Sequence, residues 1–496
     1  MTLGHNTTRQ ALSRDRLDEV ASGLFDDGWR LALIAAHDDP ERLRVVYSFL
    51  RPIGQRHELT LEIPRDDAWI PTLAHRSFPA GRFEREIRDL FGIAPDGHPM
   101  PKRLVRHAHW PDGYHPMLHD ADPSPRFDSD VGSYPFIAVD GDGVYEIPVG
   151  PVHAGLIEPG HFRFSVVGET ILQVKARLWF LHRGVEKLFE GRTPEQGIEL
   201  AERISGDTAV GHTLAYVTAV EDALGIDIDE PTRAARGLLL EAERLYNHVS
   251  DLGAIANDVG YGIAHAHTQR LREALLRHNK ALTGHRLLRG GITIGGAHLR
   301  TRPDLYLFRR VADEIAEIVQ IALANSIVAD RFTGTSTLTM EQATHIGTLG
   351  YVARASGVPV DARRDHPSVH LEGFQPVVEE RGDVLARFRV RAQEVAASAH
   401  ILAALEPRAT GTRTRDPEAA TAARQAATGL GVIEAWRGTL CHRIEIGTSG
   451  TLTRVRAVDP SFLNWPALPV ALTDTIVPDF PLTNKSFNQS YAGNDL

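Results

Sequence analysis

The chain has 496 residues, of which 42% are hydrophobic and 24% are charged, enough to bury the cores of two or three domains. Acidic residues outnumber basic ones by 64 to 54, so the chain lacks the positive charge of a general nucleic-acid binder, and we expect no nucleic-acid partner. The single cysteine, Cys441, excludes a disulfide framework and an iron–sulfur cluster held by this chain, because such clusters usually take four cysteines.

No segment of the sequence is apolar for eighteen residues or more, so none is predicted to span a bilayer. The N-terminal residues also lack the apolar core of a secretory signal. We therefore expect a protein of a reducing compartment that is cytosolic or lies on the cytoplasmic side of a larger assembly.

Residues 1–110 are predicted to form a small α+β domain. Residues 42–50 and 58–63 have the alternating or continuous β-branched and aromatic residues of strands. Residues 66–78 and 81–92 are predicted to be helical, and the second helix is expected to end at Gly92.

Residues 111–145 are rich in Pro, Asp, Gly and Ser and poor in apolar side chains, so they are predicted to be an extended linker. Residues 146–496 are the second predicted domain, which begins with strands and becomes mainly helical from about Glu186 because apolar residues then recur at helical spacing. The predicted fold class is an α+β N-terminal domain followed by a mainly α-helical domain with peripheral β elements. In this second part, strands are predicted at 144–155 and 160–181, helices within 232–259, 268–282, 303–328 and 382–405, and short strands and turns from Gly431.

The segment GRFEREIRDLFGI, residues 81–93, places charged side chains around an apolar face. Taken alone, it predicts an amphipathic helix with i,i+3 and i,i+4 ion pairs. The string also closely resembles the signature of the C-type subunit of respiratory complex I. The second domain resembles the D-type subunit, in the same order, through GPVHAG (150–155), EPGHFRF (158–164), HRGVEKL (182–188), ERISGD (202–207), NHVSDLG (247–253), ARASGVPVDARRDHP (353–367), GDVLARFRVRAQEV (382–395) and SFLNWPAL (461–468).

A fused C–D polypeptide that contains EPGHFRF most resembles the large subunit of formate-hydrogenlyase-type, energy-converting NiFe hydrogenases. The resemblance implies that the second domain has the fold of a NiFe-hydrogenase large subunit. It also implies a partner similar to the B-type iron–sulfur subunit of complex I, which carries a 4Fe–4S cluster, and integral membrane subunits as further partners.

In the hydrogenase family a nickel–iron centre is held by four thiolates from two Cys-x-x-Cys pairs. By the resemblance, the four positions are occupied here by Ser205, Thr208, Ser490 and Gly493. Soft thiolate ligands are needed to hold such metals, and hydroxyl groups do not replace them. We therefore predict that this chain binds no metal and is not by itself an active NiFe hydrogenase.

In complex I the emptied pocket receives the quinone headgroup, and the resemblance places a His and a Tyr there as hydrogen-bond donors. The His is present as His153, whereas Gly206 stands at the Tyr position. Asp258 matches the carboxylate that partners the His, and such a pair can deliver protons as a general acid. Without the resemblance, nothing in the sequence requires His153 and Asp258 to be in contact.

Two residues are expected, by the same resemblance, beside the partner's 4Fe–4S cluster or the pocket. Arg203 would favour the reduced cluster electrostatically, and the alternative is a buried salt bridge with Glu202 or Glu199. His212 matches a family histidine, and the alternative is a hydrogen-bonded histidine of the core.

Two carboxylates are expected to serve a proton route. Glu186 matches a family glutamate that passes protons to the metal, and the alternative is an ion pair with Lys187 or Arg183. Asp207 departs from the family and adds a carboxylate where the relatives place their reactive group.

Two functions follow, from different classes. In the first, the chain passes electrons from the partner's 4Fe–4S cluster to a quinone-like acceptor, within an NADH:quinone oxidoreductase-like or formate hydrogenlyase-like complex on the cytoplasmic side of a membrane. In the second, it is a non-catalytic scaffold that holds such a complex together and couples it to the membrane arm. Neither function needs a cofactor bound by this chain alone. The missing thiolates and Tyr favour the scaffold, and the presence of His153 and Asp258 favours quinone chemistry.

Overall fold

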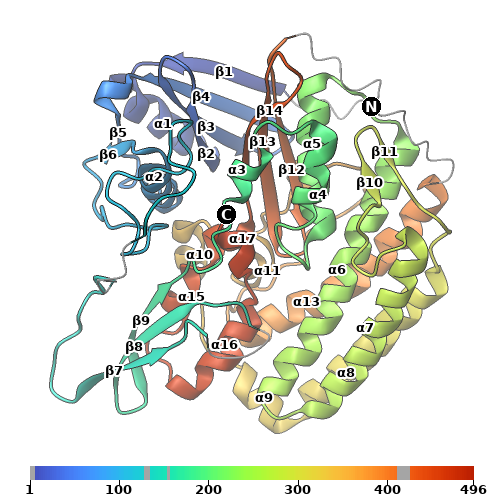
Figure 1. Cartoon of the computed structure of the whole chain (residues 1–496). Coiled ribbons are helices and arrows are strands. Elements are labelled where there is room, and N and C mark those ends of the chain that lie inside the picture. Colours follow the sequence, from blue (N-terminus) through green and yellow to red (C-terminus); the bar gives the residue numbers. More distant parts are fainter. Residues whose placement is uncertain (1–5, 128–133, 153–156, 410–424) are drawn as a thin grey trace.

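The N-terminal domain forms a four-stranded sheet, seen in a computed structural model that describes residues 6–127, 134–152, 157–409 and 425–496 (Figure 1). The strands predicted at 42–50 and 58–63 are confirmed as the antiparallel pair β3 and β4, in a sheet of order β1–β4–β3–β2 whose edge strand β1 is parallel to β4. The elements of this domain are β1 (Asn6–Leu12), α1 (Leu17–Asp26), β2 (Arg30–Asp38), β3 (Leu43–Arg51), β4 (Gln55–Ile63), β5 (Trp69–Pro71), α2 (Phe78–Phe91) and β6 (Ala94–Asp96).

The helix predicted over 66–78 is wrong. Residues 65–67 form a single 3₁₀ turn, and Trp69–Pro71 form β5, which pairs in parallel with β6. Pro71 explains the difference, because proline lacks the N–H of a helix interior and disfavours helical backbone at the residue before it.

Helix α2 begins three residues before the predicted helix 81–92 and ends at Phe91, because its C-cap Gly92 takes the left-handed conformation (φ 74°) that favours glycine. Its acidic side chains do not form the i,i+3 or i,i+4 pairs that an isolated amphipathic helix predicts. Each one is buried and reaches another segment: Glu84 accepts from Leu73 N (2.6 Å), Asp89 accepts from Leu104 N (2.7 Å), and Glu86 pairs with an arginine of the second domain.

The second domain begins with strands inside the predicted segments 144–155 and 160–181, and they form an antiparallel sheet of order β7–β8–β9. The first of them ends at Val149, and residues 153–155 of its predicted segment lie outside the described residues. The helices predicted from Glu186 onward are confirmed, but the segment 303–328 is divided into α8 and α9 at Asn325, whose side chain accepts from Ile327 N and caps α9. The elements up to the helical bundle are β7 (Val144–Val149), β8 (His161–Val167), β9 (Thr170–Arg177), α3 (Val185–Phe189), α4 (Pro194–Ala201), α5 (Ala209–Leu224), α6 (Glu230–Asp258), α7 (Gly262–Thr283), β10 (Ile292–Thr293), β11 (Gly296–Ala297), α8 (Leu305–Ala324) and α9 (Ser326–Phe332).

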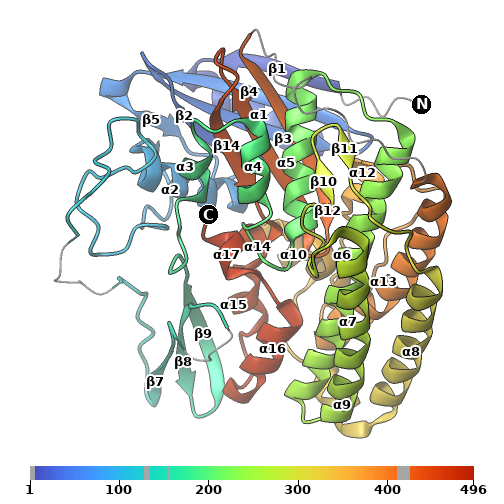
Figure 2. The same ribbon diagram turned by 45° about the vertical axis from the view of Figure 1, so that its right-hand side comes forward.

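Helices α6, α7, α8 and α13 lie side by side as a bundle (Figure 2). The strands predicted from Gly431 are present, but the chain then ends in short helices and not in strands and turns. The remaining elements are α10 (Met340–Ile346), α11 (Gly350–Ala355), α12 (Ala362–Asp365), α13 (Val384–Leu405), β12 (Ala427–Ala435), β13 (Gly438–Ile446), β14 (Leu452–Val458), α14 (Pro460–Asn464), α15 (Ala467–Ala471), α16 (Phe480–Phe487) and α17 (Tyr491–Asn494).

The antiparallel sheet β12–β13–β14 stands between the N-terminal sheet and helix α5 (Figure 1). Successive side chains of a strand point to opposite faces, so β12 contributes to two hydrophobic cores. Leu430 and Val432 pack in the core that includes the N-terminal domain, and Ile433 and Ala435 pack in the core of the bundle and α5. The core of the N-terminal domain therefore also contains side chains of the second predicted domain, and β12 connects it to the core of the bundle.

Arginines of this central sheet tie the two domains together. Arg456, on β14, contacts Glu86 of α2 and Glu186 of α3, each at 3.0 Å, and all three side chains are almost fully buried. Arg454 adds a second contact to Glu186 (2.8 Å). We call Glu86, Arg454, Arg456 and Glu186 the domain junction.

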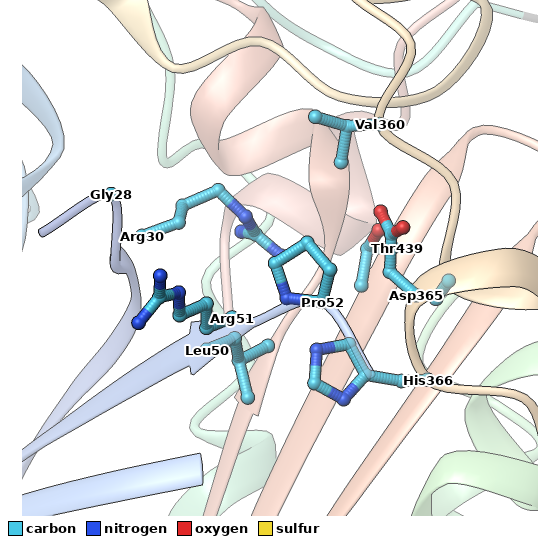
Figure 3. A pocket seen from close by; sticks show the side chains of 10 residues that line it. Gly28, Arg30, Leu50, Arg51, Pro52, Val360, Asp365, His366 and Thr439 are labelled. Atoms are coloured by element: carbon cyan, nitrogen blue, oxygen red, sulfur yellow. The ribbon is translucent and has the colours of Figure 1, made fainter. Parts of the chain in front are cut away.

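A cavity of about 170 Å³ remains elsewhere between the two domains (Figure 3). Arg30 and Pro52 of the N-terminal domain line it together with Asp365, His366 and Thr439 of the second domain. None of the residues predicted for the functional site lines this cavity. Among the described residues, no helix is long and apolar enough to cross a membrane.

Candidate functional site

Two serines that are far apart in the sequence meet in the second domain. Ser205 lies in the turn before α5, Ser490 is the N-cap of α17, and their Oγ atoms are 2.8 Å apart. Ser490 Oγ also accepts from Gly493 N (2.9 Å), as expected of a serine at a helix N-cap. Three of the four positions that the resemblance assigns to the hydrogenase thiolates are thus in direct contact.

The fourth position joins them through Asp207. Ser205 Oγ and Thr208 Oγ1 both donate to Asp207 Oδ1, at 3.0 and 3.1 Å. Ser205 therefore donates to the carboxylate and accepts from Ser490, which gives the series of hydroxyl groups a fixed direction.

A guanidinium group completes this arrangement. Arg437, in the turn between β12 and β13, binds Asp207 through two hydrogen bonds of 2.6 and 2.7 Å. The neighbouring Trp436 Nε1 donates to Thr208 Oγ1 and to the backbone oxygen of Asp207, both at 3.0 Å. We call Ser205, Asp207, Thr208, Arg437 and Ser490 the polar centre.

Charge at the polar centre is balanced without a metal ion. Desolvation raises the pKa of Asp207, but the ion pair and hydrogen bonds with Arg437, helped by Ser205 and Thr208, outweigh it and hold the pKa below its ordinary value. The same pair raises the pKa of Arg437, whose desolvation works in the other direction. Asp207 is therefore a carboxylate and Arg437 a guanidinium at neutral pH.

The residues present do not fit a nickel–iron centre. The side chains at these positions are two serines and a threonine, each already hydrogen-bonded, and a thiolate donor is absent from all four. A Cβ atom at Gly493 would lie 2.6 Å from Asp459 Cγ, so a ligand side chain has no room there. No group of three or more His, Cys, Asp or Glu suited to a metal occurs among the described residues.

The polar centre is open on one side. The side chain of Asp207 is 40% exposed, whereas that of Arg437 is 3% exposed. Gly206 is exposed, and a Cβ placed on it would meet no described atom within 4 Å. Space for a larger group is therefore present beside Asp207, at the position that the resemblance assigns to the tyrosine of complex I.

Arg203 lies on the same exposed turn. Its guanidinium binds Glu199 (3.0 Å) on the surface, and both side chains are well exposed. The alternative prediction, a buried salt bridge with Glu202 or Glu199, is correct about the partner Glu199 and wrong about the burial of the pair. That Arg203 lies beside the 4Fe–4S cluster of a partner subunit stays a prediction.

His212 is fully buried and uses both ring nitrogens. Nε2 lies 3.0 Å from Asp459 Oδ2, and Nδ1 lies 3.1 Å from Nε2 of His442. This is the geometry that the core-histidine alternative predicts. Asp459 is in turn the residue that approaches Gly493, so His212 packs behind the polar centre.

Glu186 belongs to the domain junction. The alternative of an ion pair named Lys187 or Arg183, but the structure pairs Glu186 with Arg454 and Arg456. Desolvation raises the pKa of Glu186. The ion pairs with Arg454 and Arg456 have the larger, opposite effect and keep the pKa below its ordinary value. A carboxylate held in this way is a poor proton carrier, so its role on a proton route stays a prediction without geometric support.

The predicted contact between His153 and Asp258 is untested, because His153 lies outside the described residues. Asp258 is the last residue of α6, and burial raises its pKa. Asn247, on the same helix, donates to the backbone oxygen of Asp207 (2.8 Å). Eleven residues of helix place Asp258 about 16 Å further along the axis, so it does not belong to the polar centre.

Three residues of this region were not found from the sequence: Arg437, Trp436 and Asp459. A sequence signal existed for the first, because Asp207 was expected near a buried site and a buried carboxylate needs a cation. Nothing in the sequence says which of the many arginines supplies it.

Three families match parts of the chain. The family described as "Respiratory-chain NADH dehydrogenase, 30 Kd subunit" matches residues 11–126, and "Respiratory-chain NADH dehydrogenase, 49 Kd subunit" matches residues 258–429. The family "Nickel-dependent hydrogenase" matches residues 183–252, which include the turn of the polar centre.

Similar proteins match most of the chain. Formate hydrogenlyase subunit 5 of Escherichia coli is 32% identical over 97% of this chain and 87% of its own length. Hydrogenase-4 component G of Escherichia coli is 33% identical over 87% of this chain and 77% of its own length. A chain in the structure of the membrane-bound sulfane sulfur reductase, an archaeal respiratory membrane complex, has a TM-score of 0.64, 24% identity, and coverage of 71% of this chain and 99% of its own, which indicates a shared fold.

Proposed function

Because this chain belongs to the family of fused complex I 30 kDa and 49 kDa (C/D) subunits, which includes formate hydrogenlyase subunit 5 and hydrogenase-4 component G, we propose that it is a peripheral-arm subunit of a membrane-associated oxidoreductase complex. In this proposal it lies on the cytoplasmic side of the membrane. It docks on integral membrane subunits and on a B-type iron–sulfur partner that carries a 4Fe–4S cluster.

We further propose that electrons from that cluster pass to a quinone-like acceptor at the polar centre. The single observation behind this proposal is the open side of the centre: Asp207 is part-exposed, and Gly206 leaves space beside it. A carbonyl oxygen of a quinone is a hydrogen-bond acceptor, and the guanidinium of Arg437 supplies N–H donors next to that space. Ser205 adds a donor when its hydroxyl turns from Asp207 to the acceptor.

Reduction of a quinone to a quinol takes two electrons from the cluster and two protons from the protein or the solvent. Asp207 is held as a carboxylate by Arg437, so it orients the donors and does not supply these protons itself. In the proposal His153 donates protons to the acceptor, Asp258, further along α6, supplies His153 with them, and Arg203 tunes the potential of the partner's cluster.

The experiment is a quinone reductase assay on the purified complex, in the wild type and in His153→Ala and Asp207→Asn. We expect both variants to lose turnover while the exposed control His298→Ala keeps it. Unchanged turnover in both variants would rule out quinone chemistry at this site, and stoichiometric nickel in the complex would contradict the metal-free assignment.

A scaffold is the second candidate, favoured by the saturation of the polar centre. The hydroxyl groups of Ser205, Thr208 and Ser490 all have partners, and Asp207 and Arg437 neutralise each other. If the chain is a scaffold, Asp207→Asn lowers the yield of assembled complex while turnover per assembled complex stays constant. Size-exclusion chromatography combined with the assay separates the two candidates.

A further inference from the structure

Behind the polar centre, the second domain buries a cluster of charged side chains that the proposed function does not use. They come from α6, α11, α12, α13 and β12 and from the residue before α12, and none is more than 8% exposed. We call them the Glu394 cluster. Its members are the guanidinium groups of Arg244, Arg354 and Arg363, the carboxylates of Glu241, Asp361, Glu394 and Glu434, and the imidazole of His248.

The carboxylates of this cluster are all in the geometry of ionised groups. Both oxygens of each accept a hydrogen bond or an ion-pair contact from an arginine, a hydroxyl, a backbone N–H or the imidazole. Glu394 shows the pattern, with Oε1 contacting Arg354 (2.7 Å) and Arg363 (3.0 Å). Four carboxylates against three guanidinium groups leave one uncompensated negative charge in the protein interior, and an isolated buried charge is costly.

His248 is placed to supply the missing positive charge. Its Nε2 lies 2.7 Å from Glu394 Oε2, while its Nδ1 is buried and has no hydrogen-bond partner among the residues that the structure describes. The ring is close to perpendicular to the rings of Tyr351 and Trp436, at 75° and 80°, with centroids 6.0 Å away in both cases. Aromatic faces carry negative charge density that attracts a nearby cation, so these surroundings tolerate an imidazolium.

We propose that His248 and Glu394 form a one-proton binding site inside the Glu394 cluster. When the site is empty, His248 is neutral, donates Nε2–H to Glu394 and leaves the cluster with one negative charge. When one proton from solvent is bound at Nδ1, the imidazolium makes the cluster neutral and no heavy atom has to move.

Glu434 is the competing place for this proton, because burial and the neighbouring Asp361 carboxylate raise its pKa, but its contacts argue against it. Its Oε1 faces Arg354 (2.8 Å), and its Oε2 faces Ala362 N (2.9 Å) and Thr439 Oγ1 (2.7 Å). A proton on Glu434 would require the Thr439 hydroxyl to turn around. Nδ1 of His248 requires no rearrangement.

The charges around His248 determine the pH at which the site binds its proton. From α13 it faces Glu394 and Arg391, from its own helix Arg244, and across Trp436 it faces Arg437. Burial lowers the pKa of His248, and the hydrogen bond to Glu394 works in the opposite direction. The site is therefore empty near neutral pH and is loaded by acidification or by additional negative charge nearby.

One aromatic ring connects this proton to the polar centre. Trp436 packs against His248, donates Nε1–H to Thr208 Oγ1, and lies under the Arg437 guanidinium (Cζ 4.0 Å from the ring centroid). A change of charge at Asp207 or Arg437 must therefore change the proton affinity of His248. This inference concerns side chains of this chain and does not depend on which acceptor is used.

The test is a pH titration of the full-length chain with ¹⁵N-labelled histidine, because imidazole ¹⁵N shifts distinguish one ring N–H from two. The signal of His248 is the one missing in His248→Gln. In Glu394→Gln we expect its midpoint to fall by about one to three pH units, since an adjacent negative charge is lost. In Arg437→Gln we expect the midpoint to rise.

Opposite shifts in these two variants support the proposal. It is overturned if the midpoint is the same in the wild type, Glu394→Gln and Arg437→Gln, or if the ring stays neutral in both the wild type and Arg437→Gln at every pH at which the chain is folded. Arg437→Gln decides the matter if Glu394→Gln does not fold. His298→Gln, at an exposed histidine, is the matched control and should leave the His248 signal unchanged.

Discussion

The polar centre and the domain junction both rest on arginines of the same three-stranded sheet, yet they differ in their access to solvent. At the junction, Arg456 and its carboxylate partners Glu86 and Glu186 are 3–4% exposed. At the polar centre, Arg437 is equally buried but its partner Asp207 is 40% exposed. A closed ion pair can only fix the fold, whereas a half-open one can exchange contacts with a bound molecule.

The largest effect is expected from breaking the junction. Arg456→Met leaves Glu86 and Glu186 buried beside one remaining arginine, and removing one partner of a buried ion pair costs about 3–5 kcal/mol. Urea unfolding of the purified chain measures this loss. A cost below about 1 kcal/mol would mean that the junction does not hold the domains together.

A smaller loss is expected at the packed edge of the polar centre. In Gly493→Ala the new Cβ would lie 2.6 Å from Asp459 Cγ, and overpacking of this kind costs about 1–3 kcal/mol. The matched control is Gly206→Ala, where a Cβ meets no described atom within 4 Å. Equal stability of the two variants in thermal unfolding would contradict the crowding at Gly493.

The part-exposed ion pair of Asp207 and Arg437 should make the stability of the chain depend on pH. The pKa of Asp207 is lowered in the folded chain, so its ionised form stabilises the fold above the unfolded pKa, and this contribution is lost as the pH falls through the folded value. Asp207→Asn should thus be less stable than the wild type at pH 7, and the difference should shrink below about pH 4. Denaturant unfolding at several pH values tests this, and a constant difference would contradict it.

The smallest effect is expected at the exposed turn. Arg203 and Glu199 form a surface pair, so Arg203→Ala should change the free energy of unfolding by less than about 1 kcal/mol. Added salt should reduce even this change, because exposed ion pairs are screened. A loss as large as that of Arg456→Met would show that exposure does not separate the two regions.

Local features were predictable from the sequence where a short-range rule controls them. The end of α2 at Gly92 follows from one glycine, and the strands β3 and β4 follow from their alternation. The helix predicted at 66–78 is absent because Pro71 interrupts helical backbone, which is again a short-range rule.

Contacts between distant segments were not predictable in the same way. The resemblance to hydrogenases named Ser205 and Ser490 as members of one site, and the structure puts their oxygens 2.8 Å apart. The partner of Asp207 is 230 residues away, and a single sequence has many arginines that could fill that role. The acidic residues of α2 show the same limit, since composition predicted surface pairs and the fold uses them as buried anchors.

The position of Arg456 has a consequence for any attempt to study the two halves apart. A fragment that stops at residue 110 keeps Glu86 but leaves its cation behind on β14, and it also loses the aromatic face of Phe462 that stacks on Phe83. In such a fragment Glu86 would lack its ion-pair partner and the apolar surface around Phe83 would be exposed to water, which promotes aggregation. Co-expression of both halves, so that each completes the other, is the route by which separated polypeptides could still assemble.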